Sequence, residues 1–203
     1  MSLGSIGWTS SSAARRAPDT WRAIATFGAL GLAVVVRWLI FRNQALDGVA
    51  EGFVFGVALL AAAGLGGMSV SMPRPAALAA GLAAGALLVA LSLMARSPWQ
   101  PPVLDHAAPF MPWLAVTTLV ATGEELVLRG TAWRWIAAAG GDAAALLATS
   151  VLFALIHVPV YGPSVVPLDF GVGLLFGGLR IWFGGPAAPS VAHVVADLAT
   201  WWL

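Results

Sequence analysis

The chain has 203 residues, of which 60% are hydrophobic and 9% are charged, with a formal net charge of +1 and no Cys. Its mean hydropathy is +0.88, whereas a soluble domain has about 25% charged residues. These values exclude a soluble globular domain, a disordered chain and a nucleic-acid-binding protein with a basic face, and they predict a multi-span membrane protein.

The N-terminal residues 1–20 are polar and small, and we expect them to form a flexible tail. The apolar run that follows, Trp21 to Phe41, has the length of about 20 residues that crosses a bilayer core. A cleaved signal peptide has a shorter apolar region of about 7–15 residues. This run is therefore interpreted as a retained first span, and residues 21–203 as one transmembrane domain.

Six further apolar segments follow, separated by breaks that hold Pro, Gly and most of the stray charges. They run approximately over 49–67, 76–95, 110–135, 143–160, 166–183 and 187–203. All are expected to be helices, because an open sheet edge cannot satisfy its backbone groups in lipid. The prediction is an all-α, polytopic transmembrane helix bundle of about seven spans. Gly81 to Gly85 is expected to allow close helix contact.

The positions of the Arg residues predict an orientation. With the N-terminus in the cytoplasm, the inner side would hold Arg15, Arg16, Arg22, Arg74, Arg134 and Arg180, and the outer side Arg37, Arg42 and Arg96. This bias follows the positive-inside rule, so we expect a protein of the bacterial cytoplasmic (inner) membrane with its N-terminus in the cytoplasm. Arg37, near a span end, is expected to snorkel to the interface.

A small set of ionisable side chains remains inside the apolar segments, where charge is costly and marks functional candidates. It comprises Glu124, Glu125, Arg129, His157, His193 and Asp197. Glu125 and Arg129 are four residues apart and can pair on one helix face. Glu124 points about 100° away from Glu125, so its partners are expected on other helices, with His157 and His193 the obvious ones.

These side chains suit hydrolysis by an activated water. A carboxylate next to an imidazole can hold a water and act as its general base. A second imidazole can donate a hydrogen bond to a developing oxyanion. Neither Ser150 nor Ser190 lies in a G-x-S-x-G setting, so peptide hydrolysis without a nucleophilic side chain is favoured over a Ser/His/Asp mechanism.

Three motifs carry a family resemblance: Glu-Glu-x-x-x-Arg at 124–129, Phe-x-x-x-His at 153–157 and His-x-x-x-Asp at 193–197. In this order, on three polar-bearing spans, they resemble the CPBP family of CAAX-protease and bacteriocin-processing (ABI) intramembrane proteases, which are similar to Rce1. The resemblance covers about residues 110–200, the motif-bearing core. It implies an intramembrane endopeptidase acting on a membrane-associated peptide or protein, such as a C-terminal sorting tail or a maturing peptide.

The resemblance also implies roles for the motif residues. Glu124 would be the general base that activates water, assisted by His157, while Glu125 and Arg129 would be a supporting pair that shapes the site. No cofactor is expected, because the similar characterised proteases are described as glutamic-type. Zn²⁺ held by two His and a Glu at the same site is the alternative that the sequence leaves open.

His193 and Asp197 would form the oxyanion-stabilising side of the site. Asp197 stands where eukaryotic relatives have Asn, and where bacterial relatives commonly have Asp or Asn. An ionised Asp only accepts hydrogen bonds, so Asp197 must be protonated or must act by orienting His193.

Two other functional classes stay open. Intramembrane acids and His also form the proton relays of a proton-coupled transporter or channel, although no internal repeat supports that reading. A non-catalytic scaffold or immunity protein would keep the fold without needing Glu124. The expected partners are a membrane-embedded substrate and the lipid bilayer, with no nucleic acid. Of the other polar residues, Asp169 is expected at a helix N-terminus and His106 in a solvated loop.

Overall fold

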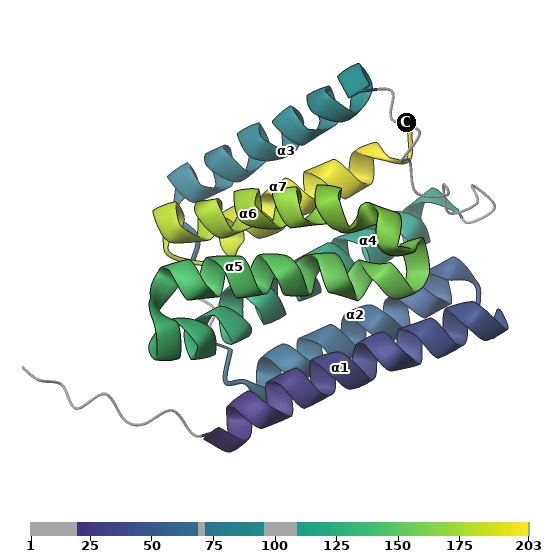
Figure 1. Ribbon diagram of the computed structural model, residues 1–203. Coiled ribbons are helices and arrows are strands. Elements are labelled where there is room, and N and C mark those ends of the chain that lie inside the picture. Colours follow the sequence, from purple (N-terminus) through teal and green to yellow (C-terminus); the bar gives the residue numbers. More distant parts are fainter. Residues whose placement is uncertain (1–19, 69–71, 96–108, 203) are drawn as a thin grey trace, which may run out of the picture.

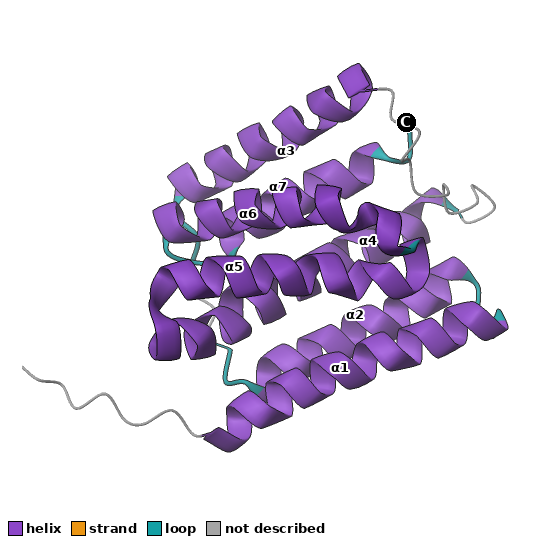
Figure 2. Cartoon of the chain, viewed as in Figure 1, coloured by secondary structure: helices purple, strands orange, loops and turns teal. Residues whose placement is uncertain are grey.

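The computed structural model describes residues 20–68, 72–95 and 109–202, so the predicted tail up to residue 19 and the His106 loop lie outside the described residues. The helices are α1 (Thr20–Asn43), α2 (Gly48–Leu65), α3 (Pro75–Ala95), α4 (Phe110–Glu125), the π-helix η1 (Leu126–Ala132), α5 (Trp133–Tyr161), the short 3₁₀-helix η2 (Pro163–Val165), α6 (Val166–Phe183) and α7 (Ala187–Ala199). The described residues contain no strand (Figure 2), which confirms the all-α prediction.

Five helical stretches are long and apolar enough to cross a membrane, which agrees with the predicted transmembrane bundle. They are Thr20–Asn43, Gly48–Leu65, Pro75–Met94, Phe110–Tyr161 and Pro163–Phe183. Large apolar side chains point outward from these helices, such as Leu82 and Leu91 of α3, both more than half exposed. In a bilayer such side chains face the lipid acyl chains, which are as apolar as the side chains themselves.

The longest of these stretches contains a reversal that the sequence interpretation misplaced. The expected spans were 110–135 and 143–160, but the helix continues through Gly140 and breaks at Gly141. Gly141 has φ 79° and ψ 176°, a conformation that only Gly adopts readily. The chain doubles back there, so that the main part of α5 runs in the opposite direction to α4 (Figure 1).

The last helix is shorter than predicted. A span was expected over 187–203, but α7 ends at Ala199 and turns follow it. Its 13 residues rise about 20 Å at 1.5 Å each, against a bilayer core of about 30 Å. Beyond α7, the Trp201 ring packs on Phe110 and Trp113 at the start of α4, with ring centroids 5.1 and 4.7 Å apart. The extent predicted for this segment is therefore wrong.

The central helices are α4 and α7. Helix α4 packs between α2 and α7, and α3 packs on the far side of α7 rather than on α2, its neighbour in sequence (Figure 1). Gly81 and Gly85 face α7, as the predicted close contact requires. A Cβ at Gly81 would lie 2.6 Å from the Ala188 carbonyl oxygen, and one at Gly85 would lie 2.6 Å from Val195 Cβ.

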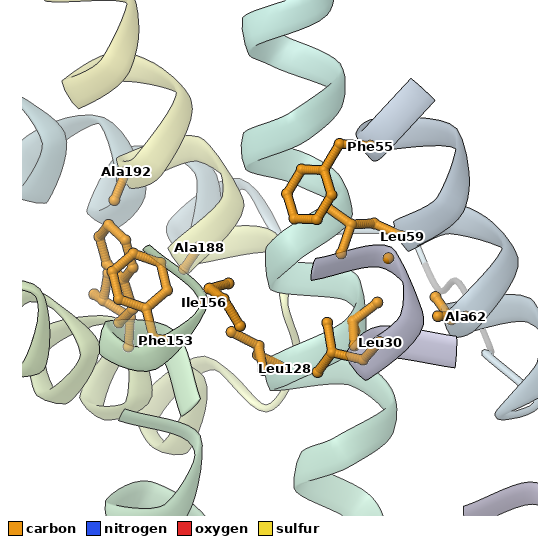
Figure 3. Packing of buried hydrophobic residues seen from close by; sticks show 14 of the residues in the cluster. Leu30, Phe55, Leu59, Ala62, Leu128, Phe153, Ile156, Ala188 and Ala192 are labelled. Atoms are coloured by element: carbon orange, nitrogen blue, oxygen red, sulfur yellow. The ribbon is translucent and has the colours of Figure 1, made fainter. Parts of the chain in front are cut away.

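The apolar core lies on both sides of the long helix formed by α4 and η1, as Figure 3 shows. On one side are α1 and α2 side chains such as Leu30 and Leu59; on the other are Phe153 of α5 and Ala192 of α7. This packing fixes the rotation of the long helix, and with it the direction in which its acidic residues point.

Arg37 does not snorkel, which corrects the sequence interpretation. Its side chain lies between α1 and α2, where Nε donates to Glu51 Oε1 at 3.0 Å and the guanidinium lies over the Phe55 ring at 4.5 Å. Both side chains of the ion pair are only 9% exposed. The cation is held by a carboxylate inside the bundle because it faces α2, although it lies near the end of α1.

Candidate active site

The reversal of the chain at Gly141 brings His157 of the Phe-x-x-x-His motif close to Glu124 of the Glu-Glu-x-x-x-Arg motif. Glu124 lies 17 residues before Gly141 and His157 lies 16 residues after it. Residues equally far from the turn of an antiparallel helix pair lie at the same height, because both helices rise 1.5 Å per residue. Nε2 of His157 is accordingly 3.8 Å from Oε2 of Glu124.

Helix α7 brings the third motif to the same place. His193 is buried, and its ring approaches both acids of the pair. Nδ1 lies 3.2 Å from Glu125 Oε1, and Nε2 lies 4.0 Å from Glu124 Oε2. Three helical segments that are distant in sequence thus place two imidazoles around two adjacent carboxyl groups.

Glu124 and Glu125 each have a buried Oε2 without a hydrogen-bond partner among the described residues, and that of Glu124 lies near both imidazoles. The side chain of Glu124 is 2% exposed. A buried carboxylate oxygen without a partner is costly. The distances of 3.8 and 4.0 Å to the imidazoles of His157 and His193 exceed a direct hydrogen bond, and polar groups at such separations are commonly bridged by water. The geometry suits a water held between Glu124 and the two rings.

Glu125 pairs with Arg129, as the four-residue spacing predicts. Nη1 donates to Glu125 Oε1 at 2.9 Å, and Nη2 donates to the carbonyl of Gly173 on α6 at 3.0 Å. The guanidinium also lies over the rings of Phe153 and Phe176, 4.8 and 5.6 Å from their centroids, in a cation–π arrangement. Both members of the pair are fully buried, so Arg129 joins the acidic helix to α5 and α6.

The helix widens into the π-helix η1 directly after the two acids, a feature that the sequence did not indicate. Trp133 N–H donates to Leu128 O, whereas an α-helix would direct it to Arg129 O. Arg129 O instead accepts a hydrogen bond from Arg180 Nε at 2.8 Å. A π-segment inside a helix often marks a functional position, and this one carries the cation that holds Glu125.

A single hydrogen bond sets the tautomer of His157. Nδ1 lies 2.7 Å from the carbonyl oxygen of Phe153, one turn earlier. A carbonyl only accepts, so Nδ1 carries the proton and Nε2 of the neutral ring presents its lone pair toward Glu124. Phe153 therefore orients this imidazole through its backbone carbonyl.

His193 is held between carboxyl groups. Glu125 is ion-paired with Arg129, so it accepts a hydrogen bond from Nδ1 of His193. Nε2 lies 3.4 Å from Asp197 Oδ2, and the Asp197 side chain is 41% exposed. With Nδ1 protonated, Nε2 donates a hydrogen bond only in the imidazolium form. A carboxylate at position 197 would favour that form by its charge.

All six predicted site residues are therefore neighbours, and two further polar side chains lie among them. Asp169 of α6 approaches His157 with Oδ2 3.8 Å from Nδ1. The Tyr161 ring stacks on the His157 ring at a centroid distance of 5.9 Å. A sequence signal for Tyr161 was available, because it follows His157 by one helical turn on the same face.

A catalytic Zn²⁺ site has three protein ligands and one open position. The described residues include no group of three His, Cys, Asp or Glu side chains arranged to hold one. Ligands of a tetrahedral Zn²⁺ site lie about 2.0–2.2 Å from the metal, so two of them are about 3.4 Å apart. The separations from Glu124 to the imidazoles, 3.8 and 4.0 Å, are wider.

Comparison with known protein families gives one match, to the model described as "Type II CAAX prenyl endopeptidase Rce1-like", over residues 106–199. No curated protein and no solved structure matches the chain. The matched segment includes all three motifs and the helices that place them, while α1, α2 and α3 precede it. Residues 106–199 are thus similar to the Rce1-like family, which points to a CAAX-type intramembrane protease.

Proposed function

We propose that the protein is an intramembrane endopeptidase of the glutamic type, in which Glu124 activates the attacking water. The observation that carries this proposal is the buried Glu124 Oε2, which has no hydrogen-bond partner among the described residues and lies 3.8 and 4.0 Å from two imidazoles. The substrate class is a membrane-associated peptide or protein, such as a C-terminal sorting tail or a maturing peptide.

The reaction uses water as the nucleophile. Glu124 takes a proton from the water as its oxygen bonds to the scissile carbonyl carbon, and His157 Nε2 accepts a hydrogen bond from the same water. The carbonyl oxygen becomes an oxyanion, which His193 stabilises by donating from Nε2. The C–N bond then breaks, and Glu124 returns its proton to the leaving amine.

Asp197 and the Glu125–Arg129 pair support these groups without touching the reacting atoms. Asp197, 3.4 Å from Nε2 of His193, orients that ring and stabilises its imidazolium form, so that it serves as the donor. Glu125 holds the other ring nitrogen and is itself held by Arg129. This arrangement makes His193 a fixed donor beside the water of Glu124.

Purified protein in lipid vesicles, given an internally quenched prenylated peptide with a C-terminal CaaX sequence, tests the proposal. The wild type is expected to release one defined C-terminal fragment by mass spectrometry. Glu124→Gln keeps the size of the side chain but is a far weaker base, so we expect the rate to fall by about 10³-fold. Undiminished cleavage by Glu124→Gln would contradict the mechanism.

The metal-free chemistry is part of the proposal and has its own test. Incubation with a strong Zn²⁺ chelator, followed by its removal, should leave the cleavage rate unchanged. A catalytic Zn²⁺ would have to lower the pKa of its bound water to about 7, so its loss would abolish the reaction. A chelator-sensitive rate that added Zn²⁺ restores would replace the glutamic mechanism with a metal-dependent one.

The location in the bacterial cytoplasmic membrane, with the N-terminus in the cytoplasm, is also proposed, on the distribution of Arg. The chain has no Cys, so one introduced Cys is a unique chemical label. In intact cells a Ser12→Cys variant should resist a membrane-impermeant thiol reagent and react only after lysis. Labelling of intact cells would reverse the orientation.

A further inference from the structure

Asp169 occupies a position that its place in the sequence only partly explains. It lies in the first turn of α6, as predicted for an acid near a helix N-terminus. Its carboxylate, however, faces α5, with Oδ2 3.8 Å from Nδ1 of His157 and both side chains largely buried, at 18% and 15% exposed. A helix-capping role does not require an imidazole at that distance.

The turn between α5 and α6 creates this pairing. Gly162 has φ 82°, a left-handed conformation suited to Gly, and Pro163 begins the short helix η2 directly after it. His157 lies five residues before Gly162 and Asp169 lies seven residues after it. The two side chains therefore meet across the turn between neighbouring helices.

The imidazole of His157 consequently lies between two carboxyl groups. Nε2 faces Glu124 on α4, and Nδ1, which donates to Phe153 O, faces Asp169 on α6. We propose that Asp169 is a positioning residue for His157: it fixes the orientation of the ring and stabilises the positive charge that the ring gains as Nε2 accepts a hydrogen bond from the attacking water. The catalytic role of Asp169 rests on the proposed function, whereas its pairing with His157 does not.

In many enzymes a third group orients the side chain that helps to activate the nucleophile. Asp169 has the corresponding task for His157. Glu124 takes one proton of the water while the other is donated in a hydrogen bond to Nε2, which puts partial positive charge on the ring, and a carboxylate beside Nδ1 offsets that charge. Glu124 then returns its proton to the leaving amine, and Asp169 neither gains nor loses a proton. In Ser-His-Asp enzymes the buried Asp has the same task of holding tautomer and charge.

Other ionisable groups lie near His157 and Asp169 and also influence the pH dependence of this pair. From α4 the group is Glu124, and from α7 the groups are His193 and Asp197, all within electrostatic range of Asp169. Tyr161 stacks on His157 from its own helix. Asp169 is the member of this set that faces Nδ1, which distinguishes its effect from theirs.

A spectroscopic experiment tests the pairing independently of activity. The chain has three His, so a protein labelled with ¹⁵N-His gives few signals, and His157→Gln assigns one of them. Asp169→Asn should shift the Nδ1 signal of His157, because it removes the carboxylate 3.8 Å from that nitrogen. Asp142→Asn is the matched control: it changes the first acid after the Gly141 break, which accepts from Trp133 Nε1 at 3.1 Å, and should leave that signal unchanged.

A kinetic experiment tests the role in the reaction. With the prenylated CaaX peptide in vesicles, Asp169→Asn should lower kcat on the order of tenfold with KM unchanged, as losses of orienting partners do. The acidic limb of its pH–rate profile should move to lower pH, because the ionisable groups of the site lose a negative neighbour. Asp169→Glu keeps the charge and should recover most of kcat, and Asp142→Asn should behave as wild type.

The outcomes separate the inference from the proposed function. An unchanged His157 signal in Asp169→Asn overturns the pairing, whatever the enzyme does. A changed signal with wild-type kcat and pH profile overturns the catalytic part. A lower kcat with an unmoved profile, accompanied by a lower melting temperature, reduces Asp169 to a helix-capping residue. Absence of cleavage by the wild type argues against the proposed function and leaves the spectroscopic test of the pairing in force.

Discussion

Two buried Arg–Glu pairs hold different halves of the molecule, and they differ in what else they touch. Arg129 and Glu125 are 2.9 Å apart and fully buried, within the Rce1-like segment. Arg37 and Glu51 are 3.0 Å apart and 9% exposed, between α1 and α2, which precede that segment. Both pairs satisfy the rule that buried charges are paired.

The difference lies in the connections of each pair. Glu125 also holds Nδ1 of His193, and Arg129 also binds Gly173 O and lies over Phe153. Besides Glu51, Arg37 contacts the ring of Phe55 and lies within electrostatic range of Tyr161 and Glu124. The two pairs are alike in distance and burial, and they differ in that the Glu125–Arg129 pair hydrogen-bonds directly to a proposed catalytic ring whereas Arg37 acts on the site only at longer range.

The largest effect on stability is expected from breaking the pair of the site. Arg129→Met leaves Glu125 buried without its cation, which typically costs about 3–5 kcal/mol, and it also releases His193. We expect a strongly lowered melting temperature in detergent and no cleavage. A well-folded Arg129→Met protein with normal activity would show that the pair does not support the site.

A smaller effect is expected from the same change in the other pair. Arg37→Met should destabilise the protein by about 2 kcal/mol, less than the buried-pair range, because Glu51 retains some access to water. Arg37→Met with Glu51→Met should recover most of this loss, since the double variant leaves no unpaired charge. Thermal unfolding of the three variants and the wild type measures the coupling. Equal losses for the single and double variants would mean that the ion pair itself contributes little.

The smallest effect is expected at the exposed end of the site. Asp197→Asn replaces the carboxylate by an amide of the same size, which can donate a hydrogen bond. We expect cleavage to change by less than about tenfold, because His193 stays held by Glu125 and a neutral donor replaces the charge that favours imidazolium. A loss comparable to that of Glu124→Gln would show that the Asp197 carboxylate itself takes part in proton transfer.

Much of the site followed from sequence because its signals are local. Charge inside an apolar segment is rare, and the four-residue spacing of Glu125 and Arg129 predicts a shared helix face. The first three helices and α6 agree with their expected ranges to within two residues. Hydropathy marks such segments because polar breaks bound them.

The remaining features depend on packing between distant residues. Hydropathy placed the break after α4 too early, since the apolar run continues to Gly140. Hydropathy also extended the last predicted helix through Trp201, because an apolar turn and an apolar helix have the same hydropathy. The pairing of Arg37 with Glu51, and of His157 with Asp169, depends on which helix faces meet. A single sequence does not reveal which helix faces meet.

The most direct test of the central claim compares two buried glutamates of the same protein under single-turnover conditions. Glu124→Gln and Glu51→Gln make the same chemical change, one beside the two imidazoles and one in the Arg37 pair. The account predicts a rate about 10³-fold lower for Glu124→Gln and a nearly unchanged rate for Glu51→Gln in folded protein, with unfolding measured on the same samples. Equal rates for the two folded variants would contradict the assignment of Glu124 as the base that activates water.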